Sequence, residues 1–368
     1  MLSITAEGRL IASEVEVKQE QGAADSMVEE ASVEEQEDEL FDEEDRDEDF
    51  DPDAEEDASA GVGLLVPGGE PQEVHCGAFP EKQRRLRRNW WLWALIGGAV
   101  LGIGFYLLGR FLPEDLRWGR WIAPVVWVVM LGVAYASYSQ SLTYYYKNHI
   151  VPQCVNLICT RGRYDPSDGI EEDVFMSSGL YSRWPDRYKT EDLVCGRIGR
   201  TWFRFAEVHA QEERRVETKN GTRSTWVDIF RGFFFEADFN KHFRGQTTLV
   251  PNFWGAKWLA GRQRVSLENQ ALMKAFLVCS TDQVEARYIL TPSLMERIML
   301  LWKRYPEQLS ISFTGSRIMI ARKTSHNHYE MGLWRSLRRC VECDTAAIRG
   351  LTAIVEELNM NTRIWTKE

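Results

Sequence analysis

The chain has 368 residues and a formal net charge of −11, and this charge is unevenly divided. Residues 1–60 hold 24 acidic and three basic residues, whereas the remainder holds 41 basic and 31 acidic residues. The acidic segment has too few apolar side chains to offset an ordering entropy of about 1–2 kcal/mol per residue, so residues 1–80 are predicted to be a disordered acidic tail. The seven cysteines form no regular framework and favour a reducing compartment, and no secretory signal peptide is visible.

Two apolar stretches come next, Trp90–Leu112 and Trp121–Leu142, and each is long enough to cross a hydrocarbon core of about 30 Å as a helix. Because the link between them is short, they are predicted to form an antiparallel transmembrane hairpin. Neither interior holds Lys, His or an acid, which argues against an ion pathway. Gly98 and Gly102 form a GxxxG motif that is typical of close packing within a hairpin, with a homodimer through this face as the alternative.

A basic juxtamembrane segment, residues 81–89, precedes the first apolar stretch. Its charge exceeds that of the link between the two stretches, so the positive-inside rule predicts that both termini are cytoplasmic. Contact with anionic lipid at the membrane surface is expected for Lys82, Arg84, Arg85, Arg87 and Arg88. No nucleic-acid partner is expected, because the neighbouring acidic tail would repel phosphate.

Residues 143–368 are predicted to form one cytoplasmic α+β domain. Leu193–Ile198 and Thr201–Val208 alternate as neighbouring strands, and Asn220-Gly221 is typical of a type I′ hairpin turn. The run Phe233-Phe234-Phe235 is predicted to be core. The sheet is therefore expected to be mostly antiparallel, because no βαβ alternation is present.

The last third of the domain predicts a lobe of helices and one hairpin. Asp282–Ile289 is predicted as a short helix, and Thr291-Pro292 supplies an N-cap and a first-turn proline for a helix over Ser293–Arg304. Gln308–Ala321 alternates around a Thr-Gly-Ser turn, which predicts a hairpin. A final helix is predicted to begin with Asp344 as its cap and to end near residue 358.

Three segments carry a family resemblance: Phe234–Phe243, Asp282–Arg297 and Ile354–Asn359. They are similar to a bacterial membrane-anchored family known as domain of unknown function 3137, which automated labels sometimes call galanin. The resemblance covers roughly residues 140–368. It implies a two-span protein of the inner (plasma) membrane with a cytoplasmic domain of unassigned activity, and it supplies no catalytic residues.

The cysteines offer weak candidates for a metal site. Cys340-Val341-Glu342-Cys343 is a lone CxxC motif, and a structural zinc site needs two more ligands, which Cys154 and Cys159 could supply only if the fold brought them together. The context lacks the βαβ pattern of a thioredoxin-like redox motif. Structural cysteines are the simpler interpretation, so neither a metal nor a cofactor is expected.

Four residues offer weak candidates for acid–base catalysis. Glu207 and His209 share one face of a predicted strand, and Asp238 and His242 would have to converge on them. Surface or hydrogen-bonded polar residues are the simpler interpretation. The imidazoles of His326-Asn327-His328 are predicted to be exposed in a loop.

The favoured hypothesis is a non-enzymatic adaptor or regulatory module that presents its cytoplasmic domain at the bilayer. Its acidic tail would bind a basic protein partner or the chain's own positive domain. The alternative is a membrane-tethered enzyme of hydrolase type that uses Glu207 and His209 with Asp238 and His242.

Overall fold

The structure is a computed structural model that describes residues 62–64, 72–111, 121–218, 221–239, 241–252 and 263–358. All of these residues belong to one compact unit, Glu55–Glu368. The acidic segment 1–60, for which disorder is predicted, lies outside the described residues.

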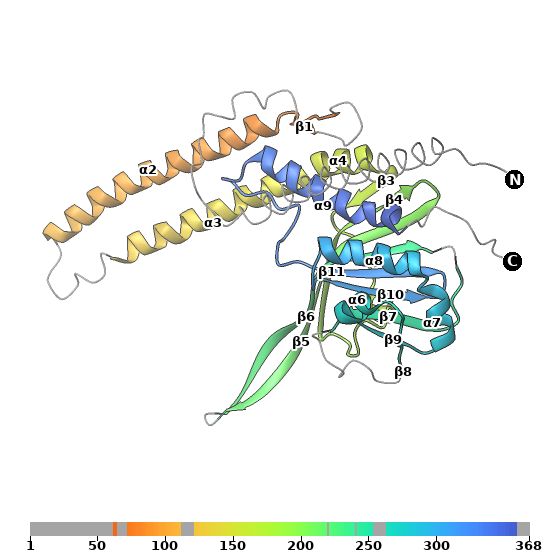
Figure 1. The fold of residues 1–368 in the computed structure, drawn as a ribbon. Coiled ribbons are helices and arrows are strands. Elements are labelled where there is room, and N and C mark those ends of the chain that lie inside the picture. The colour runs from red at the N-terminus through yellow and green to blue at the C-terminus, as the bar shows by residue number, and fades with distance from the viewer. Residues whose placement is uncertain are drawn as a thin grey trace, which may run out of the picture. The chain divides into compact units, whose positions relative to one another are not determined.

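Two long helices, α2 (Phe79–Phe111) and α3 (Ile122–Tyr145), lie side by side as an antiparallel hairpin (Figure 1). Their apolar side chains are exposed over most of the length, as at Leu95 and Val128. Both helices are long and apolar enough to cross a membrane. Helix α2 begins before the predicted span because the basic segment continues the same helix.

The folded part begins before residue 80, the predicted end of the tail. A short antiparallel pair, β1 (Val62–Leu64) with β2 (Gln72–Val74), precedes α2. Val74 and Phe79 are fully buried. Val74 and Phe79 are part of the larger hydrophobic core. The average composition of residues 1–80 does not reveal that its last residues are apolar enough to be buried.

Helix α3 continues without a break into the π-helix η3 (Tyr146–Ile150) and then into α4 (Val151–Ile158). Pro152 lies in the first turn of α4, a position that tolerates proline. The environment changes along this continuous helical run, because Leu142 and Tyr146 are fully buried in the domain while most earlier apolar residues are exposed.

The centre of the domain is a nine-stranded sheet in the order β3-β4-β5-β6-β11-β10-β7-β9-β8 among the described residues. Every neighbouring pair is antiparallel. The predicted α+β class with a mostly antiparallel sheet is confirmed. The strands are β3 (Thr160–Asp165), β4 (Arg187–Ile198), β5 (Thr201–Thr218), β6 (Gly221–Asp238), β7 (Gln246–Pro251), β8 (Gln263–Arg264), β9 (Phe276–Ser280), β10 (Leu309–Thr314) and β11 (Arg317–Lys323).

The sheet has an apolar layer on each face, because successive residues of a strand point to opposite sides. On β6, Phe233 and Phe235 join the larger core with α4 and α9, whereas Phe234 joins a smaller core with α5. All three phenylalanines are fully buried, as predicted. Gly232 has a φ of +145°, and a Cβ there would lie 2.2 Å from the Arg322 carbonyl oxygen, so only glycine fits.

The remaining helices are α5 (Glu172–Ser177), α6 (Gln270–Ala275), α7 (Gln283–Ile289), α8 (Pro292–Arg304) and α9 (Leu337–Glu357). The predicted cap of α8 is confirmed, because the Thr291 hydroxyl accepts from the Leu294 N–H. The short helix predicted over Asp282–Ile289 is α7, and the structure shows that Asp282 caps it by accepting from the Val284 N–H. The prediction for the last helix is wrong at its start. Helix α9 begins at Leu337, so Asp344 lies in its interior, where its carboxylate binds other elements.

Strands β5 and β6 extend past the sheet as a two-stranded arm (Figure 1). The pairing of β4 with β5 stops at Arg187 and Gln211, beyond which β5 pairs only with β6 among the described residues. Asn220 of the predicted turn lies outside the described residues. Gly221, the other residue of the predicted turn, is instead the first residue of β6 and pairs with Thr218.

Candidate functional site

A buried polar cluster lies where η3 meets the sheet. The Lys147 amino group is 2.8 Å from Asp192 Oδ2, 3.2 Å from Glu330 Oε1 and 3.7 Å from Glu191 Oε2. The side chains of Lys147 and Asp192 are only 9% and 1% exposed. The helical run that leaves the hairpin is therefore tied to the sheet by an ion pair that is largely out of water. We use the name polar joint for these four residues together with the neighbouring cluster around Asp344. Its members are Lys147, Glu191, Asp192, Glu330, Tyr146, His328, Tyr329 and Asp344.

A bulge in β4 brings two carboxylates to one amino group. The register with β5 shifts between Glu191 and Val194, and Asp192 has a φ of +62°, in the left-handed region. In a regular strand, consecutive side chains point to opposite faces. Here both Glu191 and Asp192 reach Lys147, so the strained backbone serves the ion pair.

Asp344 forms the second part of the polar joint. Its Oδ2 accepts from the Tyr146 hydroxyl at 2.7 Å, and its Oδ1 accepts from the Tyr329 N–H at 3.2 Å. His328 Nδ1 lies 3.5 Å from the same Oδ1. One carboxylate in the interior of α9 thus joins η3 to the segment that precedes α9.

Glu207 faces the polar joint from β5. Burial, together with the nearby carboxylates of Asp192 and Glu191, raises the pKa of Glu207 to about 8. Its Oε2 and the Tyr329 hydroxyl have no hydrogen-bond partner among the described residues. Burial also raises the pKa of Asp192, to about 6, against the opposing effect of Lys147. The polar joint therefore holds carboxyl groups that titrate near neutral pH.

The predicted acid–base residues do not form one site. Glu207 and His209 share a face of β5, but His209 Nε2 lies 2.9 Å from Asp228 Oδ1 at a half-exposed position. The residue before Asp238, Ala237, pairs with Phe203, which places Asp238 about 17 Å along the ladder from Glu207 at about 3.4 Å per residue.

His242 has a separate contact. Its Nδ1 lies 3.2 Å from the Ser316 hydroxyl. The prediction that both imidazoles of residues 326–328 are exposed is wrong for His328, which is 5% exposed and packs against Phe233.

All seven cysteines are free thiols. Helix α4, with Cys154, packs against α9, with Cys340 and Cys343. No group of three or more His, Cys, Asp or Glu side chains is arranged to hold a metal ion in the part of the chain that the structure describes. Burial raises the pKa of Cys159 to about 12, which favours the thiol over the thiolate that a metal requires.

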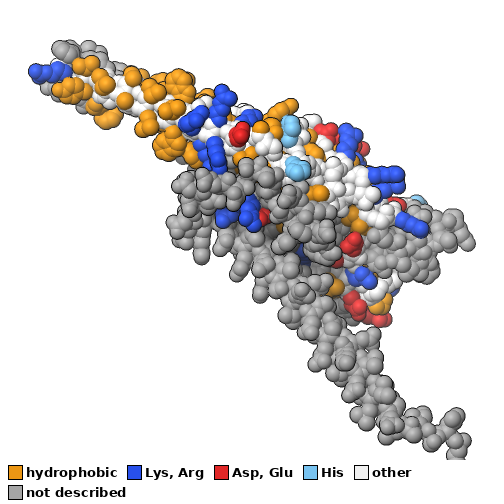
Figure 2. Space-filling view, turned by 90° about the horizontal axis from the view of Figure 1, so that it is seen from above, with side chains coloured by type: hydrophobic (Ala, Val, Ile, Leu, Met, Phe, Trp, Pro, Cys, Tyr) orange, Lys and Arg blue, Asp and Glu red, His pale blue; other side chains and the backbone are white. Residues whose placement is uncertain are grey.

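The predicted membrane-contact residues all lie in the first turns of α2. Lys82 Nζ donates to the Ser141 carbonyl at 3.4 Å, and Arg87 Nε donates to the Leu333 carbonyl at 2.7 Å. Arg84, Arg85 and Arg88 are exposed. Figure 2 shows Lys and Arg side chains gathered where the apolar hairpin meets the rest of the unit.

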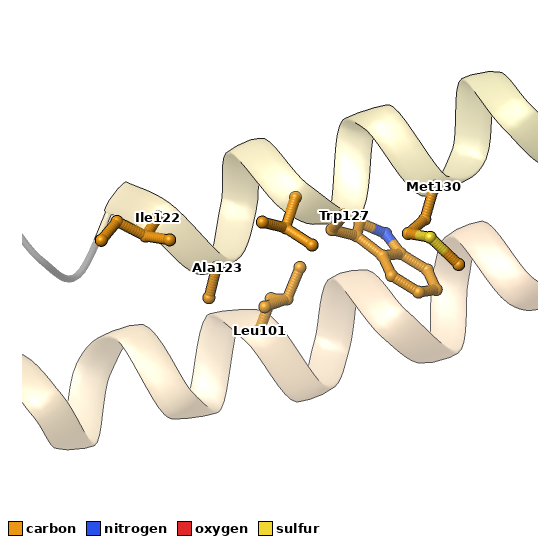
Figure 3. Close-up of a pocket in the computed structure, with 6 residues that line it drawn as sticks. Leu101, Ile122, Ala123, Trp127 and Met130 are labelled. Atoms are coloured by element: carbon orange, nitrogen blue, oxygen red, sulfur yellow. The ribbon is translucent and has the colours of Figure 1, made fainter.

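The hairpin packs through a different glycine from those of the GxxxG motif. A Cβ on Gly97 would lie 1.9 Å from the Trp127 ring, whereas a Cβ on Gly98 or Gly102 would meet nothing within 4 Å. Trp127 of α3 and Leu101 of α2 both line a shallow apolar groove between the helices (Figure 3). Gly98 and Gly102 therefore remain open in this chain.

Sequence reasoning missed the polar joint. Lys147 is a single charge that follows Tyr144-Tyr145-Tyr146 at the end of an apolar run. That isolated charge was the one feature of the sequence that could have indicated a buried ion pair. Asp192 and Asp344 gave no such indication, because their partners are distant in sequence. From its neighbours in sequence, Asp344 was predicted to be a helix cap.

Three comparisons with known proteins bear on the chain. The family model described as protein of unknown function (DUF3137) matches residues 228–360, which confirms the predicted family resemblance over that segment. No curated protein matches the sequence. A solved structure, the mycobacterial trehalose monomycolate transport factor A, TtfA, is similar over 53% of this chain and 88% of its own, at 10% identity and a TM-score of 0.30. That score is too low to carry an argument.

Proposed function

We propose that this chain, which carries a DUF3137 segment at residues 228–360, is a membrane-anchored adaptor or regulatory module without catalytic activity. The observation that carries the proposal is the polar joint, which attaches the apolar hairpin to the sheet through Lys147, Asp192 and Asp344. A domain fixed in this way to its anchor is suited to holding a binding surface at the bilayer.

The hairpin is the proposed anchor. Its exposed side chains, such as Leu95, Val100 and Val128, would be costly in water and are favourable in hydrocarbon. The basic start of α2 favours an orientation with both termini in the cytoplasm. In this topology the sheet lies on the cytoplasmic side of a plasma membrane, which agrees with seven free thiols.

The polar joint supports a regulatory role. Lys147 follows directly on the hairpin helix, and its partners lie on β4 and on the segment before α9. A tilt or rotation of α3 would move Lys147 relative to these carboxylates. The ion pair would therefore transmit a change in the hairpin to the sheet, or a change in the sheet to the hairpin.

Two further contacts belong to the proposal. The open Gly98 and Gly102 face of α2 suits close approach of a second copy within the membrane. The acidic segment 1–60 suits a basic partner. The hydrolase alternative is less favoured, because Glu207 and Asp238 are separated along the β5–β6 ladder.

Anchoring and topology can be tested on the full chain in isolated membranes. The protein should resist extraction by alkaline carbonate, and protease added from the cytoplasmic side should remove epitopes at both termini. Release by carbonate would contradict anchoring, and protection of either epitope would contradict the orientation.

The adaptor role can be tested by crosslinking in membranes, followed by purification at low and high salt with and without residues 1–60. A partner that depends on the tail should be lost on deletion and weakened by salt. Identical partner sets in all four samples would contradict a role for the tail.

A further inference from the structure

A segment far from the hairpin in sequence is fixed against the base of α2. Arg87 Nε donates to the Leu333 carbonyl at 2.7 Å, and Gln83 Nε2 donates to the Arg335 carbonyl at 2.9 Å. On the α3 side, the Thr143 hydroxyl donates to the Met331 carbonyl at 2.9 Å. Residues 331–335 are thus held by side chains from both helices of the hairpin.

This contact brings Trp334 to the level of the tryptophans of α2. Its ring lies 5.8 Å from the Trp90 ring and 6.0 Å from the Trp91 ring, both in edge-on geometry. The Arg87 guanidinium lies 5.7 Å from the Trp334 ring centre. Indole rings favour the headgroup zone of a bilayer, so Trp334 shares the position that its two neighbours have at the end of the apolar span.

Basic residues surround this cluster of tryptophans. The segments 81–88 and 334–342 together hold eight basic and two acidic residues. Arg84, Arg88 and Trp91 follow one another at helical spacing, next to the stripe that contacts residues 333–335. We call the exposed basic residues of both segments the basic collar: Arg84, Arg85, Arg88, Arg335, Arg338 and Arg339.

We propose that the basic collar and Trp334 form one composite binding surface for the phosphate headgroups of anionic phospholipids. The inference rests on the proposed membrane location of the hairpin and goes beyond it, because it assigns lipid contact to the start of α9. Arginine guanidinium groups bind phosphate in a bidentate manner. The single acidic partner within the second segment is Glu342, whose Oε1 is 2.9 Å from Arg338 Nε.

Lipid is favoured over an acidic protein segment as the occupant. The basic collar is continuous with exposed apolar side chains such as Leu92 and Trp93 on α2. The indole ring of Trp334 lies beside Trp90, between the basic collar and these apolar side chains. The protein surface changes from basic to apolar along α2, and a phospholipid changes in the same direction from phosphate to acyl chain. An acidic peptide matches only the basic part of this surface.

The experiment measures lipid selectivity of the reconstituted full chain. The wild type is placed in vesicles of equimolar phosphatidylcholine and phosphatidylglycerol, extracted in mild detergent, and its retained lipids are quantified by mass spectrometry. We expect phosphatidylglycerol to be enriched about fivefold over the bulk lipid. The variant Arg335→Glu/Arg338→Glu/Arg339→Glu should lose this enrichment, and Arg335→Lys/Arg338→Lys/Arg339→Lys should keep most of it.

A matched charge reversal controls for net charge. The residues Arg197, Arg287 and Lys303 are exposed elsewhere on the domain, so Arg197→Glu/Arg287→Glu/Lys303→Glu should retain the enrichment. Equal enrichment in the wild type and in the collar variant would overturn the proposal, as would equal loss in the control. So would a wild type without enrichment, the result expected if an acidic protein segment fills the collar. Flotation with pure phosphatidylcholine vesicles tests the hairpin anchor separately, because it does not require anionic lipid.

Discussion

The two ends of one continuous helical run invert the usual placement of side chains. Near the start of α3, Val128 is 67% exposed, whereas in η3, which follows α3 in the same run, Lys147 is 7% exposed. Apolar residues are outside in the first part, and a charge is inside in the second. The first part matches a hydrocarbon solvent, and the second matches a protein interior in which carboxylates replace water.

The comparison shows that the two parts of the helical run need different environments. The exposed apolar part of α3 needs hydrocarbon, and η3 needs the carboxylates of the domain around Lys147. Beyond its base, where hydrogen bonds attach residues 331–335, the hairpin exposes apolar side chains such as Leu95 and Val128 to the proposed bilayer. The polar joint has ion pairs and hydrogen bonds that fix direction and register. An anchor that is free in the membrane is thus coupled tightly to one domain.

The largest expected effect is at the polar joint. Lys147→Met leaves Asp192 buried without its cation, and we expect a loss of about 3–5 kcal/mol in the free energy of unfolding. Denaturant titration in detergent measures it. The control Lys189→Met removes a lysine whose side chain is 68% exposed and paired with Glu191, and should change stability by less than about 1 kcal/mol. Equal effects would contradict the buried ion pair.

A smaller effect is expected in the hairpin. Val128→Arg places a charge within the first half of the proposed span and should raise the free energy of insertion by up to about 2.5–3.5 kcal/mol, the cost of such a charge at the centre of a span. The inserted fraction measured in a membrane-integration assay should fall accordingly. Val284 on α7 is 76% exposed, and Val284→Arg should leave integration unchanged. If the two variants behave alike, exposure at Val128 does not reflect contact with lipid.

Next comes the pH dependence at Glu207. Its pKa rises from 4.5 to about 8 on folding, so the unfolded chain releases the proton first. The stability contribution of this group is therefore fully present below pH 4.5 and lost as pH rises through 8. Glu207→Gln should be more stable than the wild type at pH 8, on the order of 2 kcal/mol, with the difference vanishing below pH 4.5. Thermal unfolding at both pH values tests this; a difference independent of pH would contradict it.

The smallest effect separates two adjacent glycines. Gly97→Ala would push against the Trp127 ring and should destabilise the hairpin by about 1 kcal/mol. Gly98→Ala meets open space and should leave the unfolding midpoint of the monomer unchanged. Unfolding of the monomeric chain in detergent compares them. A larger loss for Gly98→Ala would show that the GxxxG face packs within the hairpin after all.

The sequence by itself determined the features that depend on local chemistry or on periodicity. Two apolar stretches gave the helices of the hairpin, and alternating residues gave antiparallel strands. The cap at Thr291 was predicted because a cap binds N–H groups only two or three residues away. The buried run Phe233-Phe234-Phe235 followed from its composition alone.

Only the tertiary structure decided which polar residues act together. Lys147 meets Asp192 through a bulge that shifts the β4–β5 register, and Tyr146 meets Asp344 across 198 positions of sequence. Trp334 reaches the tryptophans of α2 because residues 331–335 are held by hydrogen bonds from both hairpin helices. Such pairings depend on how whole elements pack. A side chain such as Asp344 therefore looks like a cap in sequence and becomes a buried acceptor in the fold.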